Sequence, residues 1–213
     1  MCSFCIIPFA RGRARPRAWD DLLREAEGLA AAGARELVLT GVNLGTYLEG
    51  GRTRVDVGDA RAARPGVARL RISSSEPTTV EEGVLERMAD RAHRLVPFLH
   101  LPLQSGSGRI LAAMRRRYGP DGYRAFAERA LERVPDLALG ADVMTGFPGE
   151  DGAAFAETMA LLEALPFAYF HVFPYSPRGS TPATRLPGAV PAPEKQRRVA
   201  RLRALSDRKR LAF

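Results

Sequence analysis

The stretch LALGADV at residues 137–143 is a short apolar run that closes on a polar residue, Asp142, and leads to a glycine turn at Gly146. Four runs of the same type, rich in β-branched and aromatic residues, occur at residues 36–39, 70–72, 98–101 and 169–173. They lack clean two-residue alternation and are bounded by Gly or Pro, as strands buried on both faces are. We therefore predict five buried strands.

Amphipathic stripes with helical spacing lie between these strands. The four stripes are Trp19, Leu22, Leu23, Ala26, Leu29 and Ala30, with Gly33 as a stop; Tyr123, Phe126, Ala127, Ala130 and Leu131; Phe155, Met159 and Leu162, with Asp151 near the start; and Val199, Leu202 and Leu205. Residues 50–66 depart from this repeat, because they contain Gly58 and Pro65 and few large apolar residues. We expect a short or poorly formed helix there.

Strands separated by helices at a spacing of roughly 30 residues indicate βα units and a parallel sheet. Such a chain can form a doubly wound sheet or part of a (β/α) barrel. Polar or special residues follow almost every strand, at residues 40–43, 73–76, 104–106, 142–146 and 174–176. In barrels the carboxyl ends of several strands build one active-site mouth, whereas a doubly wound sheet concentrates ligand groups at a single switch point. The pattern favours an α/β fold that is a partial (β/α) barrel.

The composition is that of one globular domain, with 213 residues, 46% hydrophobic and 26% charged. No segment approaches the ~20 apolar residues of a membrane span, and the start has no export signal, so we expect a cytoplasmic protein with no membrane contact. The net charge is +8, and only Lys195 and Lys209 are lysines. Such arginine usage can reflect a GC-rich genome as well as RNA binding, so charge alone leaves the partner open.

Cys2 and Cys5 are the two cysteines of the chain, spaced C-x-x-C. Their number excludes a disulfide framework, and a thioredoxin-like motif would follow a first strand, which is not present before Cys2. A zinc module would require a second pair of ligands. An incidental pair of thiols and half of a metal site remain.

Seven segments, taken in order, give the chain a resemblance to the radical SAM tRNA methylthiotransferase family. They are residues 2–13 (CSFCIIPFARGR), 39–47 (LTGVNLGTY), 71–77 (RISSSEP), 100–107 (HLPLQSGS), 114–118 (MRRRY), 142–150 (DVMTGFPGE) and 173–178 (FPYSPR). The segment TGVNLG resembles the branch that acts on threonylcarbamoyl-adenosine beside the tRNA anticodon, and the isopentenyl-adenosine branch is the alternative. Residues 139–141 and 178–181 depart from the family pattern, which places full activity in doubt.

The resemblance implies a 4Fe-4S cluster and S-adenosyl-L-methionine as cofactors, with Cys2 and Cys5 as the second and third cluster ligands. It also implies reductive cleavage of the sulfonium, an electron donor for the cluster and a tRNA anticodon stem-loop as partner. By comparison with the family, residues 1–213 are expected to be a radical SAM core of the (β/α) type truncated before its first strand and first cysteine. The cluster-bearing N-terminal domain and the C-terminal TRAM domain are expected to be absent. The chain alone is then expected to be inactive or impaired, and a silent βα scaffold with a basic RNA-binding surface is the alternative.

No catalytic side chain is predicted. The predicted cofactor-binding residues follow the strands or belong to the family segments, and they are Gly41, Asn43, Ser74, Glu76, Gln104, Arg117 and Asp142. A guanidinium such as that of Arg117 matches a carboxylate with two hydrogen bonds, whereas its neighbours Arg115 and Arg116 are expected to be solvated. The alternatives are an ordinary turn at Gly41 and helix capping at Ser74 and Glu76.

Two further segments carry both a functional and a structural interpretation. Residues 146–149 can shape an adenine pocket or form a plain turn. The alternating arginines 11, 13, 15 and 17 can bind tRNA phosphates or follow from genomic arginine usage. We predict that the thiols and the polar residues after successive strands meet around one cofactor.

Overall fold

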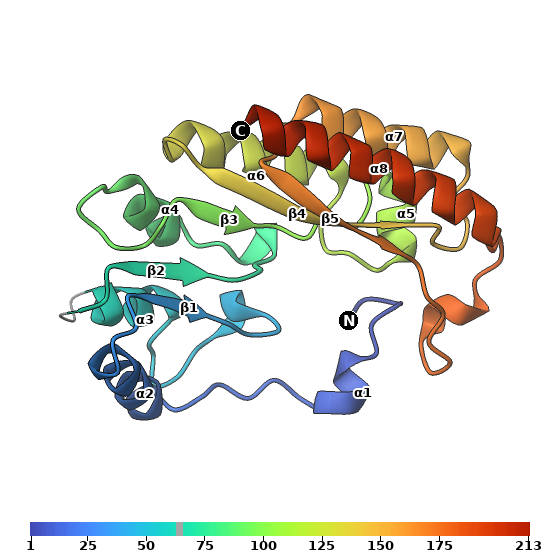
Figure 1. Cartoon of the computed structure of the whole chain (residues 1–213). Helices are drawn as coiled ribbons and strands as arrows, with labels where there is room; N and C mark the ends of the chain where they lie inside the picture. The colour runs from blue at the N-terminus through green and yellow to red at the C-terminus, as the bar shows by residue number, and fades with distance from the viewer. Residues whose placement is uncertain (63–65) are drawn as a thin grey trace. The chain divides into compact units, whose positions relative to one another are not determined.

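The computed structural model describes residues 1–62 and 66–213 of the chain. Two compact units are distinguished, each built from segments that are separate in sequence. The cysteine unit comprises Met1–Arg13, Leu101–Glu128 and Leu139–Phe213. The serine unit comprises Ala14–His100 and Arg129–Ala138. Figure 1 labels the helices and strands of both units.

The cysteine unit is an α/β structure in which two parallel strands are flanked by helices. Its elements are α1 (Ile7–Arg11), α5 (Gly108–Ala113), the start of α6 (Pro120–Arg133), all but the first residue of β4 (Ala138–Thr145), α7 (Gly152–Ala164), β5 (Tyr169–Pro174), η3 (Pro182–Arg185) and α8 (Ala192–Ala212). β4 and β5 pair in parallel from Gly140 opposite Tyr169 to Thr145 opposite Pro174. Between these two strands, α7 forms the connecting helix of a βαβ unit.

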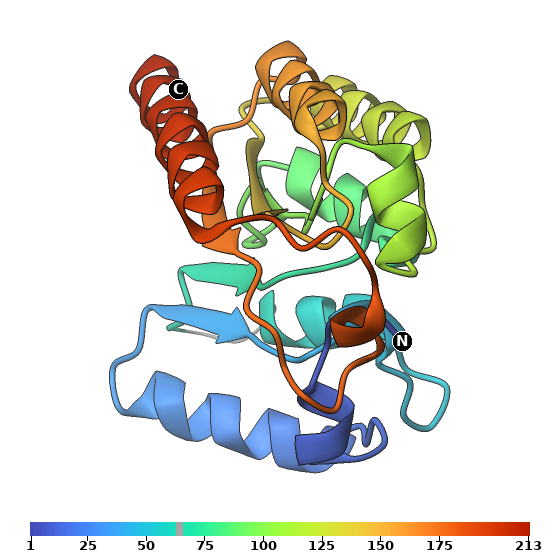
Figure 2. The same cartoon turned by 90° about the vertical axis from the view of Figure 1, so that its right-hand side faces the viewer.

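Helix α8 lies along β5 in both Figures 1 and 2. Leu202 and Leu205 of α8 are buried, and Ser206 joins the helix to the strand. The Ser206 hydroxyl accepts a hydrogen bond from the Phe170 amide at 2.9 Å and donates one to the Phe170 carbonyl at 2.8 Å. The helix thereby satisfies backbone groups at the edge of β5 that would otherwise be open to another strand.

Gly106 lies where the segment before α5 contacts α7 at very short range. A Cβ atom on Gly106 would lie 2.6 Å from the Thr158 Cα and 2.9 Å from the Glu157 carbonyl oxygen. The Gly106 amide also donates a hydrogen bond of 2.9 Å to the Thr158 hydroxyl. Because the obstructing atoms belong to backbone, they cannot move aside as a flexible side chain would.

We predict that Gly106→Ala destabilises the protein by about 1–3 kcal/mol, the usual cost of overpacking a filled site. The free energy of unfolding in urea measures this. The matched control is Gly122→Ala on α6, where no heavy atom lies within 4 Å of the added Cβ. Alanine there is expected to stabilise the helix by up to about 1 kcal/mol. Equal unfolding midpoints for the two variants would contradict the close approach at Gly106.

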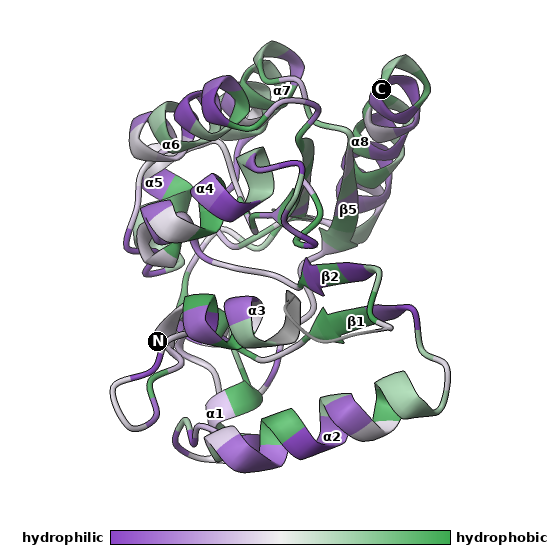
Figure 3. Ribbon diagram, turned by 90° about the vertical axis from the view of Figure 1, so that its left-hand side faces the viewer, coloured by the Kyte–Doolittle hydropathy of each residue, from purple (hydrophilic) through white to green (hydrophobic). Residues whose placement is uncertain are grey.

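The serine unit is also built from βα units. It contains α2 (Trp19–Ala31), β1 (Glu36–Leu39), η1 (Leu44–Thr46), α3 (Arg54–Ala62), β2 (Arg69–Ile72), η2 (Pro77–Thr79), α4 (Glu82–Ala89) and β3 (Phe98–His100). β1 and β2 pair in parallel from Glu36 opposite Arg69 to Leu39 opposite Ile72. Leu70 at the centre of β2 is fully buried. Helix α2 carries hydrophobic and hydrophilic residues along its length, as Figure 3 shows.

All five predicted strands are present, and their bounds differ from prediction by at most two residues at an end. The predicted helix signals are also confirmed. α2 ends before Gly33, which has a left-handed φ of 94°. Asp151 is the N-cap of α7, and its carboxylate accepts a hydrogen bond from the Ala154 amide at 2.9 Å.

We expected a short or poorly formed helix in residues 50–66, and α3 is a short helix of nine residues, Arg54–Ala62. Its Val57 and Arg54 are buried, so tertiary packing supplies what the sparse apolar residues do not suggest. Asp56 accepts a hydrogen bond of 2.7 Å from the Thr53 amide at the helix start. Pro65 lies outside the described residues. Among the helices of the described ranges, none combines the length and apolar character that crossing a bilayer requires.

Candidate functional site

Cys2 and Cys5 stand at the two ends of one tight turn. The Cys5 amide donates a hydrogen bond of 3.2 Å to the Cys2 carbonyl. Both thiols are half-buried, and neither forms a disulfide. Two thiols held on one turn, partly accessible and unbonded to each other, fit the ligand chemistry of an iron–sulfur cluster.

Ser3, between the cysteines, fixes this turn to the end of helix α5. Its amide donates to the Met114 carbonyl at 3.0 Å and its hydroxyl to the Ala113 carbonyl at 2.8 Å. Helix C-termini leave four carbonyls without helical partners, and Ser3 satisfies two of these. The Ser3 carbonyl in turn accepts the Ala183 amide at 2.9 Å, from η3, which lies beside the N-terminus in Figure 2. Ser3 itself is buried, so the turn is held from two sides.

The other two carbonyls at the end of α5 are satisfied by the chain that leaves the helix. Arg115 has a left-handed φ of 58°, and its amide donates to the Ala112 carbonyl at 2.9 Å. The Arg116 amide donates to the Leu111 carbonyl, also at 2.9 Å. This pair of bonds is the Schellman motif, whose left-handed position glycine usually occupies. The cysteine turn and the MRRRY segment therefore share one helix end.

Phe4 holds the cysteine turn to an apolar cluster. Its ring meets the buried Phe147 ring edge-on, with centroids 6.4 Å apart. The cluster contains Ile110, Met114, Phe147, Ala154, Tyr175 and Ala183. Phe147 thus belongs to the packing under the turn, and an adenine pocket at residues 146–149 stays a prediction. Burial of aromatic surface here gives the otherwise short N-terminal segment a fixed place.

Arg116 contacts the first cysteine directly, which corrects the expectation that it is solvated. Its Nη1 donates to the Cys2 Sγ at 3.1 Å, and its side chain is half-buried. Arg117, the residue selected from the sequence, is exposed, as is Arg115. The left-handed turn at Arg115 decides which of the three arginines faces Cys2. This turn could not be recognised in the sequence, because arginine rather than glycine occupies the left-handed position.

Gln104 and Asp142 are brought together at the end of β4. The Gln104 amide donates to the Asp142 carbonyl at 2.8 Å, and the Met144 amide donates to the Gln104 carbonyl at 2.8 Å. Gln104 has a φ of 68°, a conformation that non-glycine residues seldom adopt. Both side chains are half-buried. Strained backbone of this kind clusters at functional sites, so Gln104 is a candidate ligand-binding residue.

Gly41, Asn43, Ser74 and Glu76 lie in the serine unit, after β1 and β2. Gly41 and Asn43 are exposed, and Ser74 and Glu76 are half-buried. Glu76 is the N-cap residue of η2, and its carbonyl accepts the Thr79 amide at 2.9 Å, but its side chain makes no capping hydrogen bond. A meeting of these residues with the cysteines stays a prediction.

The buried Arg54 organises the loop that carries Ser74 and Glu76. Its guanidinium donates to the Ser75 hydroxyl at 2.8 Å and to the Thr79 carbonyl, and it pairs with Glu81 at 3.2 Å. Burial lowers the pKa of Arg54 from its usual value, and Glu81 opposes this shift. The buried Arg54 guanidinium therefore fixes the loop after β2, which is the loop that carries Ser74 and Glu76.

Sequence reasoning missed a row of aromatic rings on β5. Tyr169, His171 and Phe173 alternate with the buried Phe170 and Val172, and neighbouring rings have centroids 5.2 Å and 6.4 Å apart. In the register with β4, His171 is opposite Asp142. The Tyr169 ring covers Gly140, and a Cβ atom on Gly140 would lie 2.4 Å from the Tyr169 Cζ. The two-residue alternation of YFHVF was the available signal. The departure from the family pattern at Gly140 thus makes room for a ring.

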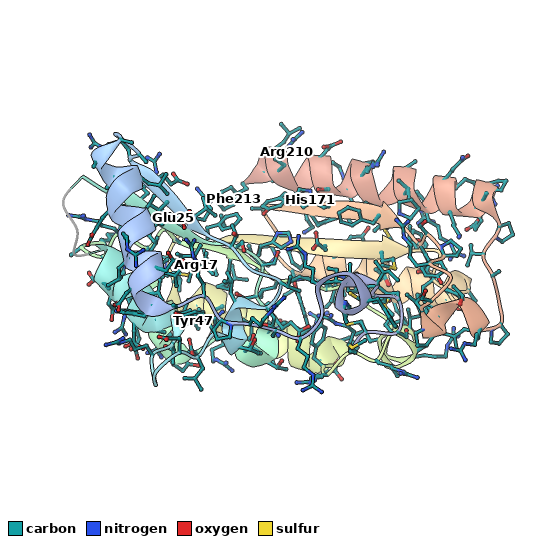
Figure 4. All side chains as sticks on the ribbon, turned by 90° about the horizontal axis from the view of Figure 1, so that it is seen from below. Arg17, Glu25, Tyr47, His171, Arg210 and Phe213 are labelled. Atoms are coloured by element: carbon teal, nitrogen blue, oxygen red, sulfur yellow. The ribbon has the colours of Figure 1, made fainter. Side chains whose placement is uncertain are left out.

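The arginine run near the N-terminus is not uniform. Arg17 pairs with Asp21 and Glu25 of α2, and its carbonyl accepts the Tyr47 hydroxyl at 3.0 Å (Figure 4). Its charge is therefore neutralised within the serine unit. Arg11, Arg13 and Arg15 are exposed.

The chain is similar to proteins of known family. The radical SAM superfamily model matches residues 1–162. Two relatives are the tRNA-2-methylthio-N(6)-dimethylallyladenosine synthase of Novosphingobium aromaticivorans, 39% identical over 217 residues, and the threonylcarbamoyladenosine tRNA methylthiotransferase MtaB of Bacillus subtilis, 40% identical over 215 residues. The alignments cover 100% and 97% of this chain and 49% and 46% of the relatives. The chain thus spans about half the length of the curated relatives it matches.

A solved structure shows the same fold. The radical S-adenosylmethionine methyltransferase TsrM from Kitasatospora setae, determined with cobalamin and a [4Fe-4S] cluster, matches with a TM-score of 0.68 at 18% identity. The match covers 85% of this chain and 36% of TsrM.

The chain belongs to the radical SAM superfamily, and the predicted α/β fold of parallel strands is confirmed as the radical SAM type. The predicted resemblance to tRNA methylthiotransferases is confirmed as well. The two branches are not separated, because a relative from each branch matches at nearly the same identity.

The cofactors of this superfamily are a 4Fe-4S cluster and S-adenosyl-L-methionine. The thiolates of Cys2 and Cys5 fit the cluster in donor type, since iron–sulfur clusters are held by cysteine sulfur. Within residues 1–62 and 66–213, no group of three or more His, Cys, Asp or Glu side chains is placed to hold a metal ion. The cysteine turn therefore accounts for two ligand positions.

Proposed function

We propose that residues 1–213 are the radical SAM core of a tRNA methylthiotransferase that acts on threonylcarbamoyl-adenosine. The observation that carries the proposal is the cysteine turn, in which two thiols are fixed by Ser3 and Phe4 against the end of α5. Identity of about 40% to two enzymes named for tRNA methylthio chemistry, over nearly the whole chain, supports the same reaction type.

Cys2 and Cys5 would hold the 4Fe-4S cluster through their thiolates. With S-adenosyl-L-methionine bound, such a cluster would supply one-electron cleavage of a sulfonium carbon–sulfur bond. The residues that would bind the adenosylmethionine are those chosen from the sequence, namely Gly41, Asn43, Ser74, Glu76, Gln104, Arg117 and Asp142. The half-buried Gln104 and Asp142 supply amide and carboxylate groups that can orient it.

The aromatic row of β5 would receive the purine of the substrate. Unstacked bases bind proteins by stacking on Phe, Tyr and His rings, with hydrogen bonds to their edges. Tyr169, His171 and Phe173 provide such rings, and Asp142 opposite His171 provides an acceptor. Phe173 is 49% exposed, so the row is accessible in this chain. The exposed Arg11, Arg13 and Arg15 would contact phosphates of the anticodon stem-loop.

The reaction can be tested on the chain reconstituted anaerobically with iron and sulfide. With dithionite as the electron donor, it is expected to convert S-adenosyl-L-methionine to 5′-deoxyadenosine and methionine at the low rate of a chain with two cluster thiolates, and chromatography quantifies both products. In the cell, the enzyme would need an electron donor that reduces its cluster, and it would act on its tRNA in the cytoplasm. A colourless chain that still retards tRNA in a gel would instead identify a silent RNA-binding scaffold.

The branch can be tested by binding alone. The segment TGVNLG at residues 40–45 supports the threonylcarbamoyl branch. An anticodon stem-loop carrying threonylcarbamoyl-adenosine is expected to bind about tenfold more tightly than one carrying isopentenyl-adenosine, because a site that pairs polar groups rejects an apolar analogue. Fluorescence anisotropy measures both affinities. Equal or reversed affinities would overturn the branch assignment.

A further inference from the structure

We propose that Arg116 is a positioning residue for Cys2, which holds the sulfur in place and raises the reduction potential of a cluster bound through it. This inference rests on the proposed function, since it concerns the cluster of the radical SAM core. Its basis is a single contact across 114 positions of sequence, the 3.1 Å hydrogen bond from Arg116 Nη1 to the Cys2 Sγ.

The guanidinium is held on a second side by Tyr118. Arg116 Nε and Nη2 donate to the Tyr118 hydroxyl at 3.0 Å and 2.7 Å. The Arg116 Cζ also lies 4.8 Å from the centroid of the Tyr118 ring. A guanidinium has five N–H donors in one plane. In Arg116, Nε and Nη2 contact the tyrosine hydroxyl while Nη1 contacts the cysteine sulfur, so one planar group bridges both. Lysine, a point charge on a flexible stem, could not reproduce both contacts.

Tyr118 is itself attached to a rigid part of the cysteine unit. Its hydroxyl donates to the Pro102 carbonyl and lies 3.3 Å from the Leu103 carbonyl. The neighbouring Tyr123 is fully buried, and its hydroxyl donates to the Leu101 carbonyl at 2.8 Å. Burial raises the pKa of Tyr123 well above its usual value, so this hydroxyl stays a donor. Arg116 therefore reaches Cys2 from a fixed platform, the segment that ends at Gln104.

The chemical effect follows from charge. Reduction adds one negative charge to an iron–sulfur cluster, and hydrogen bonds to the ligating sulfur stabilise that charge. Arg116 brings both a donor and a permanent positive charge to one ligand. Arg115 and Arg117 are exposed, where water screens their charges. Among the three consecutive arginines, Arg116 is thus the one whose contact can distinguish the oxidised from the reduced cluster.

The experiment compares the reconstituted chain with its Arg116→Gln and Arg116→Met variants in a redox titration followed by electron paramagnetic resonance. At a fixed potential, the ratio of reduced to oxidised cluster is expected to fall about tenfold, which is a shift of about −59 mV for one electron. Tyr118→Phe should give a smaller shift in the same direction, because the guanidinium stays but loses its anchor. Arg115→Gln, which removes an equal charge from an exposed neighbour, should leave the potential unchanged.

The outcomes separate this inference from the proposed function. A cluster in all variants with an unchanged potential and an unchanged resonance spectrum would overturn the role of Arg116 alone. A shift of equal size in Arg115→Gln would show that general charge, rather than the hydrogen bond, is responsible. A wild-type chain that holds no cluster would overturn both the cluster assignment and this inference. Thermal melts monitored by circular dichroism establish that each variant is folded.

Discussion

Replacing Cys2 or Cys5 by alanine is expected to remove nearly all iron and acid-labile sulfide from the anaerobically reconstituted chain. These are the two cysteines of the sequence, so each variant leaves one thiolate. The chain within its described ranges offers no cluster of other ligands that could substitute. Because thiolates are the ligands of such clusters, the broad visible absorbance should disappear with the metal.

Metal and sulfide analysis, together with the visible spectrum, checks this expectation. Ser180→Ala is a matched control, since it alters an exposed side chain and leaves the cysteine turn intact. A second comparison, Ser3→Ala, keeps both thiols and removes the 2.8 Å bond to the Ala113 carbonyl, so it should reduce cluster yield without abolishing it. Cysteine variants with wild-type iron content would refute the metal site.

Replacing Glu150 by alanine is expected to destabilise the protein by about 3 kcal/mol, the low end for breaking a buried ion pair, because Arg198 loses its buried carboxylate partner but keeps a 2.8 Å pair with Glu194. The Glu150 and Arg198 side chains are 2% and 7% exposed, and their Oε1 and Nη1 atoms are 2.5 Å apart. The same carboxylate oxygen accepts the Thr145 hydroxyl at 2.9 Å and the Gly146 amide at 3.0 Å. Its loss therefore also leaves two polar groups of the turn after β4 unsatisfied.

Urea unfolding measures the change, and an exposed ion pair provides the control. Arg109→Ala removes a 2.8 Å pair with Asp151 in which both side chains are more than half exposed, so the cost should stay below about 1 kcal/mol. The double variant Glu150→Ala, Arg198→Met should recover part of the stability, because an apolar side chain replaces the buried Arg198 guanidinium that has lost Glu150. Equal costs for Glu150→Ala and Arg109→Ala would show that burial of the pair is unimportant.

The buried pair also explains the segment for which the sequence left two interpretations. Glu150 holds the Gly146 turn from within the family segment DVMTGFPGE, while Arg198 reaches it from α8. The left-handed φ of 78° at Gly146 admits no side chain easily, and the Lys195 stem packs over it. The structural interpretation of residues 146–149 thus has support from named contacts, and a role in binding adenine would be additional to it.

The strands and most helices could be predicted because their signals are local. An apolar run bounded by Gly or Pro, or a stripe with helical spacing, is determined by neighbouring residues, and β1 matches its predicted range of 36–39. The sequence predicted that the helix in residues 50–66 would be short or poorly formed, and its nine residues in α3 include the buried Arg54 and Val57. The alternation of YFHVF was present in the sequence, and the burial of Phe170 and Val172 shows that Tyr169, His171 and Phe173 share the other face of β5.

The sequence by itself determined the parallel α/β class, the radical SAM resemblance and the pair Cys2 and Cys5 as the metal-binding candidate. Only the tertiary structure decided which arginine serves that pair. The choice of Arg116 over Arg117 depends on a left-handed residue at the end of α5 and on a contact between residues 114 positions apart. The burial of one face of a helix or strand leaves a local pattern in the sequence. The pairing of Arg116 with the Cys2 sulfur depends instead on how segments distant in sequence fold together.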